Sequence, residues 1–217
     1  PFDGCPDIKT ILFFARSFFN GGNSNVFGLR SLLLNNHKSS VIKNPINTYL
    51  KKNNLYDLKD TGWTIIRPNL YWEFIFKCGQ PCPKDLPAHV HSDLLSFELF
   101  YEGKPVISEV GTSIYGENKI REYERSSEAH NVLQVGNYLS KNKEIQWIEP
   151  IEVWSNHRAG RKANILIRDC GFTDQRYWLK GSHDGFKKVG TFYKRSIYLS
   201  LKNKEDLILK CIESIKC

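Results

Sequence analysis

Residues 88–101 read AHVHSDLLSFELFY, and the second half of this stretch decides the fold. From Leu95 to Tyr101, alternate positions carry Leu, Phe, Leu and Tyr. Because side chains two apart in a β-strand project from the same face, the run predicts a strand with one apolar face. The segment 102–105 reads EGKP, which predicts a turn, and 106–110 then predicts the returning strand.

Further short runs with β-type composition are spread over the rest of the chain from Leu55 onward. They lie at 63–67, 71–76, 131–135, 151–154, 164–169, 191–201 and 206–213. Many short strands separated by turn signals, with almost no helix between them, are typical of two packed antiparallel sheets. We therefore expect a mainly β protein, an antiparallel β-sandwich, over residues 55–217.

The first 54 residues have a different pattern. Asp7 is placed to cap a helix with apolar residues at helical spacing over 8–19, and Ser24 is placed to cap a second helix over 26–33. Two such helices cannot bury their apolar faces alone, so we expect them to end a helical domain whose remainder lies outside this chain. The sequence contains no Met, even at position 1, which also suggests a fragment of a larger protein.

The net charge and the residue composition restrict the classes of molecule that the protein is expected to bind. Lys and Arg total 31 against 23 Asp and Glu, giving a formal charge of +8 that favours polyanions such as nucleic acid, anionic lipid or acidic polysaccharide. The basic residues are scattered and no nucleic-acid motif occurs, so we expect no nucleic-acid partner. No apolar run reaches transmembrane length, no signal peptide is recognisable, and six cysteines are too few for a disulfide scaffold.

Two histidines, a carboxylate and a third histidine fall within about forty residues of sequence. His89 and His91 are two apart; on a strand they would share a face, with Cα atoms roughly 6–7 Å apart. Glu109 lies at the end of the expected returning strand, and His130 begins another expected strand. Two imidazoles and a carboxylate suit tetrahedral Zn²⁺. The alternative is that these are separate residues, each hydrogen-bonded to the backbone.

A family resemblance favours the site. From Leu55 to the end, the chain resembles the C-terminal β-sandwich domain of the heparinase II/III-like polysaccharide lyases, especially members from capsule or O-antigen clusters. The first matching segment reads PAHVHSDLLSFEL. The full set of matching segments lies at 87–99, 103–107, 111–116, 121–131, 153–154, 158–163 and 183–186.

The resemblance implies an architecture and a reaction. The family couples a helical (α/α) toroid to this sandwich and degrades acidic polysaccharides by β-elimination. Residues 1–54 would be the end of the toroid and 55–217 the heparinase II/III-like sandwich. The family's catalytic Tyr and carboxylate-neutralising Asn or His come from the toroid, so we expect the chain alone to lack normal lyase activity. The resemblance favours a periplasmic or secreted protein.

The resemblance also assigns residues. His91, Glu109 and His130 would hold a structural Zn²⁺, and His89 would be the catalytic histidine facing the substrate. Glu109 departs from the family, which more usually has Asp there, and Val90 stands where Gly is usual.

Other polar residues are candidates for the substrate cleft. Arg121 and Arg125 would bind carboxylate or sulfate groups, and Tyr115 would line the cleft; the alternatives are surface salt bridges and a tyrosine packed in a turn. His157 is expected on the surface. His183 is expected to stabilise a turn through a hydrogen bond.

Two alternatives to a lyase module stay open. The first is a non-catalytic sandwich that binds acidic glycans in cell-surface polysaccharide metabolism. The second is a structural domain whose metal only stabilises the fold.

Overall fold

The computed structural model describes residues 54–139, 144–154, 157–203 and 205–216. The chain divides into two units after Lys52, and every described residue belongs to the second. The helices expected before residue 54 therefore lie outside the described residues.

Five antiparallel strands form the first sheet, in the order β1-β2-β3-β4-β5. Its central strands alternate between buried and half-buried residues, as expected where one face meets a core. The strands are β1 (Leu55–Leu58), β2 (Trp63–Ile66), β3 (Trp72–Lys77), β4 (Phe97–Tyr101) and β5 (Lys104–Ile107).

Four longer antiparallel strands form the second sheet, in the order β10-β11-β12-β13. The register of β12 on β13 runs without interruption from Leu201↔Leu207 to Phe192↔Lys216. The strands are β10 (Ile165–Thr173), β11 (Arg176–His183), β12 (Phe192–Leu201) and β13 (Leu207–Lys216).

The hydrophobic core lies between these two sheets. Phe74 of the first sheet packs in one cluster with Leu179 and Ile197 of the second, and all three are fully buried. The sheets approach closely where β11 carries Gly181, because a Cβ at this position would lie 3.2 Å from Cζ of Phe76 in β3 of the first sheet. The predicted antiparallel β-sandwich is thus confirmed.

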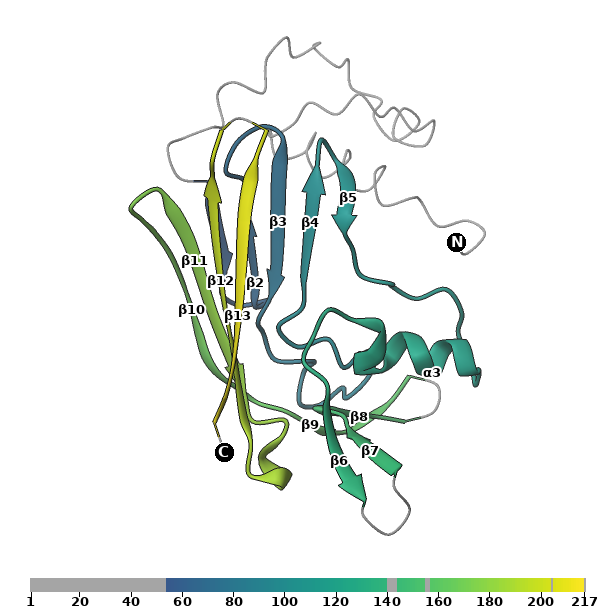
Figure 1. The fold of residues 1–217 in the computed structure, drawn as a ribbon. Coiled ribbons are helices and arrows are strands. Elements are labelled where there is room, and N and C mark those ends of the chain that lie inside the picture. Colours follow the sequence, from purple (N-terminus) through teal and green to yellow (C-terminus); the bar gives the residue numbers. More distant parts are fainter. Residues whose placement is uncertain (1–53, 140–143, 155–156, 204, 217) are drawn as a thin grey trace, which may run out of the picture. The chain divides into compact units, whose positions relative to one another are not determined.

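Shorter elements gather at one end of the two sheets (Figure 1). None of the helices in the described ranges has the length and hydropathy needed to cross a bilayer. These elements are α3 (Lys119–Arg125), η2 (Ser127–Ala129), η3 (Lys187–Val189), and the antiparallel pairs β6 (Val135–Leu139) with β7 (Glu144–Ile148) and β8 (Ile151–Val153) with β9 (Ala159–Lys162).

Most expected strands are present, with shifted ends. The runs at 63–67, 71–76 and 191–201 correspond to β2, β3 and β12. The run at 131–135 is not a strand, because the side chain of Asn131 bonds the backbone of β4 and β6 begins only at Val135. Elements β1, β7, β9, β11 and α3 were not expected.

His183 ends β11 and is buried in the core against Phe186 and Tyr193. Its Nδ1 accepts a hydrogen bond from the backbone N–H of Gly185 at 3.1 Å, which confirms the expected turn-stabilising role. Burial lowers the pKa of His183 from 6.5 to about 4; Asp184 opposes this shift and Arg195 adds to it. The folded protein therefore holds His183 neutral.

This burial predicts a pH dependence of stability. Between pH 6.5 and about 4 the unfolded chain binds a proton at His183 that the folded chain does not, so stability is lost as pH falls through this window. In His183→Gln, the slope of unfolding free energy against pH should drop by up to about 1.4 kcal/mol per pH unit. Urea unfolding at a series of pH values measures it. The control Ile197→Val, at a core position that does not pair with His183, should lower stability without changing the slope; an unchanged slope in His183→Gln would contradict the prediction.

Candidate functional site

The segment that carries His89 and His91 is a loop, which corrects the expected strand geometry. Among the described residues, it makes an isolated bridge outside the named strands, between Ala88 and Arg158. His89 has a φ of 55°, in the left-handed region that interrupts an extended strand. The loop still separates the two imidazoles: His89 is exposed, Val90 is buried, and His91 is half-buried.

Glu109, His130 and His91 lie together, although the first two are not on strands. Glu109 follows the end of β5, and His130 caps the 3₁₀ turn η2. Oε2 of Glu109 is in hydrogen-bonding contact with Nδ1 of His130. The ring of His91 lies 5.5 Å from that of His130, measured between centroids.

Asn131 fixes this cluster to the first sheet. Its side chain exchanges two hydrogen bonds with the backbone of Phe97 in β4, at 3.0 and 2.7 Å. Its Nδ2 also lies 3.4 Å from Oε1 of Glu109. No sequence pattern predicts these contacts, because Asn131 is an isolated polar residue far from β4 in the chain.

The cluster leaves donor atoms suited to a cation. The side chain of His130 is 2% exposed, and its buried Nε2 has no hydrogen-bond partner in the part of the chain that the structure describes. Burial lowers the pKa of His91 to about 4, with Asp93 opposing the shift, so the imidazole is neutral at pH 7. As the side chains lie, however, no group of three or more His, Cys, Asp or Glu in the described part of the chain is arranged to hold a metal ion.

Arg121 on α3 is buried, at 3% exposed. Its Nη1 donates to Oγ1 of Thr112 at 2.9 Å, and its guanidinium lies 5.2 Å from the centre of the Tyr115 ring. Thr112 also lies 3.4 Å from Nε2 of His91. A polar chain thus connects two residues predicted for different roles, one for substrate and one for metal.

Arg125, on the same buried face of α3, joins two segments of the chain through their backbone carbonyls. Its Nε donates to the carbonyl of Val90 at 3.1 Å, its Nη1 to that of Trp154 at 2.7 Å, and its Nη2 to that of Arg158 at 2.9 Å. Its own carbonyl accepts from the N–H of Ser92 at 2.9 Å. These bonds assign Arg125 a structural role; its predicted binding of substrate stays a prediction.

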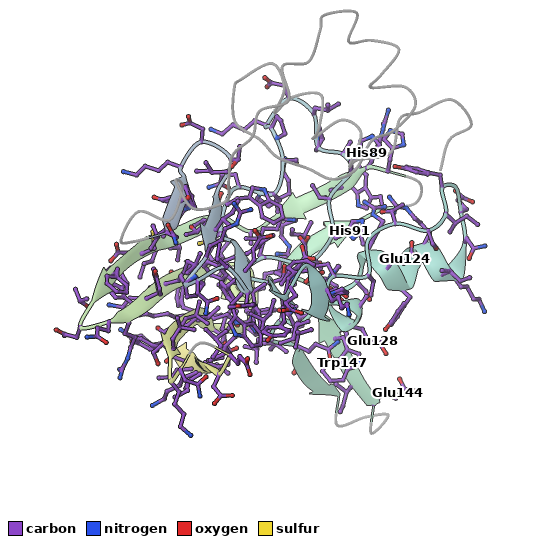
Figure 2. All side chains as sticks on the ribbon, turned by 90° about the horizontal axis from the view of Figure 1, so that it is seen from above. His89, His91, Glu124, Glu128, Glu144 and Trp147 are labelled. Atoms are coloured by element: carbon purple, nitrogen blue, oxygen red, sulfur yellow. The ribbon has the colours of Figure 1, made fainter. Side chains whose placement is uncertain are left out.

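Glu124, the third buried residue of α3, was not singled out from the sequence. It accepts from the backbone N–H of Ser113 at 3.0 Å and from its hydroxyl, and these bonds lower the pKa of the carboxyl. They tie the segment beside Thr112 to α3. Figure 2 shows Glu124 on the side of the domain that carries His89 and His91, away from Trp147 and Glu144 of the β6–β7 hairpin.

The turn between β8 and β9 adds two residues that sequence reasoning missed or left aside. The exposed ring of His157 stacks on that of His89, with centroids 5.4 Å apart and planes 25° apart. The carbonyl of His157 accepts from the N–H of His89 at 2.8 Å. Trp154, at the start of this turn, is 51% exposed. Contacts this distant in sequence have no local signal that would have revealed them.

The role of Arg125 can be tested by a substitution that keeps its charge. Arg125→Lys should lower the free energy of unfolding by about 2–4 kcal/mol, because a lysine ammonium lacks the planar fork of donors with which the guanidinium reaches three separate carbonyls. Arg158→Lys, at an exposed side chain, should stay within about 0.5 kcal/mol of wild type. Urea unfolding measures both. Equal, small effects of the two substitutions would show that the Arg125 bonds contribute little.

Comparison with known proteins identifies the family of this domain. Residues 51–210 match the family model described as Heparinase II/III-like, C-terminal, which covers well over half of the chain. The search of curated proteins gave no match. The chain therefore belongs to the heparinase II/III-like family and contains its C-terminal domain.

Proposed function

We propose that this domain is the sandwich part of a polysaccharide lyase that cleaves uronate-containing glycans, sulfated ones included, by β-elimination. The observation that carries the proposal is the placement of His89 in a domain of this family. Its imidazole is exposed, while its backbone N–H is fixed to His157. An accessible imidazole on a fixed backbone is suited to meet a polymeric substrate.

The chemistry of elimination suits these residue types. The reaction removes the C5 proton of a uronate and expels the glycosidic oxygen at C4, which leaves a C4–C5 double bond. It needs a base, an acid and a group that neutralises the carboxylate. Imidazole is the usual side chain for proton transfer near neutral pH, so we assign one transfer to His89. Arg121 suits the carboxylate. The remaining groups are assigned to the helical part of the protein, as the resemblance implies.

We also propose that His91, His130 and Glu109 hold a structural Zn²⁺. Two imidazoles and a carboxylate are ligands that zinc accepts, and the buried Nε2 of His130 lacks a hydrogen-bond partner among the described residues. Glu109 contacts the other ring nitrogen of His130, so it either ligates the ion or orients the ring as a carboxylate partner. Bound zinc would brace the loop that carries His89.

Metal content tests this site. Protein purified without chelator should contain about one zinc per chain, and His91→Ala and His130→Ala should each lose it and melt at lower temperature. Trp147→Ala, an exposed change on the β6–β7 hairpin, should keep it. Elemental analysis and thermal melts give both readouts. Wild-type protein that takes up no zinc when it is supplied would contradict the proposal.

Turnover tests the lyase assignment. The protein at its natural length should convert a uronate polymer or a glycosaminoglycan to products with the ultraviolet absorbance of a C4–C5 double bond. His89→Ala should lower kcat by about 10²–10⁴-fold and keep the zinc content, whereas Trp147→Ala should match wild type. Binding of acidic glycans with no unsaturated product would instead support a non-catalytic glycan-binding module.

A further inference from the structure

Trp154 is exposed but held in one orientation. Its indole Nε1 donates to Oε1 of Glu152 at 2.9 Å. Its ring lies against the backbone of Gly160 in β9, where an added Cβ would lie 2.8 Å from three indole atoms. An exposed tryptophan that serves only as covering for a core needs no such support, since its own core contacts would fix it. This ring is instead presented to solvent as a rigid flat surface.

Trp154 lines a pocket of about 240 Å³ between the β8–β9 pair and α3. Arg121 lines the same pocket, together with the exposed Glu117 and Glu122. A pocket of this size fits a single sugar ring rather than an extended chain. An aromatic wall facing a few polar groups is the usual composition of a small-molecule site.

The pocket has a buried positive charge, on Arg121, and exposed negative charges, on Glu117 and Glu122. Arg121 is 3% exposed, its Nε is buried without a hydrogen-bond partner, and no carboxylate among the described residues forms an ion pair with it. A buried cation without an ion pair is costly, and an anionic ligand would offset that cost. Glu117 and Glu122 are exposed and solvated, so they suit hydrogen bonds from sugar hydroxyls rather than repulsion of a charge held deeper.

We propose that this pocket is a subsite for one acidic sugar of the glycan, with the pyranose ring stacked on Trp154 and its carboxylate or sulfate paired with Arg121. The C–H groups on one face of a pyranose carry partial positive charge and match the negative face of the indole. The guanidinium supplies parallel donors for the acid group. The subsite rests on the proposed function, because it assigns a place to the substrate of that reaction.

Binding of a defined ligand tests the subsite in the full chain. The probes are a hexuronate tetrasaccharide and its carboxyl-reduced, neutral counterpart, titrated by calorimetry at fixed salt. Trp154→Ala should weaken binding of both by about tenfold, and Trp154→Phe should recover most of that loss. Arg121→Gln should weaken the charged probe by about tenfold and the neutral probe little. The urea unfolding midpoint of each variant is measured to check that the variant is folded.

Tyr123→Ala is the matched control, because this tyrosine is exposed on α3 and does not line the pocket. It should bind both probes as wild type does. The subsite is overturned if wild type binds neither probe, if it does not prefer the charged probe, or if Trp154→Ala binds as tightly as wild type. Arg121→Lys, which keeps the charge, should retain the preference even if Arg121→Gln fails to fold; loss of the preference would count against the pairing.

The outcomes separate this subsite from the lyase assignment. Tight, Trp154-dependent binding without any unsaturated product would keep the subsite and overturn the lyase. Production of unsaturated sugar at unchanged KM and kcat in Trp154→Ala would keep the lyase and overturn the subsite.

Discussion

The arrangement of this end of the domain depends on the buried guanidinium of Arg125. Among the described residues, its hydrogen bonds reach the carbonyls of Val90, Trp154 and Arg158, which belong to two segments far apart in the sequence. Burial of the side chain lowers its pKa, a sign that desolvation disfavours the charged form. Such a charge is tolerated only where its hydrogen bonds are well formed. The same bonds therefore fix how α3, the histidine loop and the β8–β9 turn meet.

This constraint explains how one short loop holds two histidines in different surroundings. Val90 is buried, and its carbonyl is bound by Arg125, so the residues on either side of it are turned to different sides. His91 lies half-buried toward His130, while His89 lies exposed against His157. Trp154, on the same turn as His157, carries the aromatic wall of the pocket. A proposed metal site, a proposed catalytic imidazole and a proposed subsite thus share one support.

The sandwich could be predicted from the sequence because β3 and β4 carry apolar residues at alternate positions. Other elements could not be predicted, for identifiable reasons. The core-facing positions of strand β11 carry Gly181 and His183 as well as Tyr177 and Leu179. The strand therefore lacks a regular alternation of apolar and polar residues. Helix α3 buries charged residues, Arg121, Glu124 and Arg125, at helical spacing. A search for apolar periodicity passes over both. The histidine pair suggested a strand, and only tertiary contacts make it a loop.

Amide hydrogen exchange in Arg125→Lys tests the central claim, that this side chain joins the histidine loop to the β8–β9 turn. The N–H of His89 bonds His157, and that of Trp154 bonds Arg158. These amides should lose protection in the variant by a larger factor than the amide of Ile197 in the core strand β12. Equal loss at all three positions, or unchanged protection at His89 and Trp154, would contradict the account.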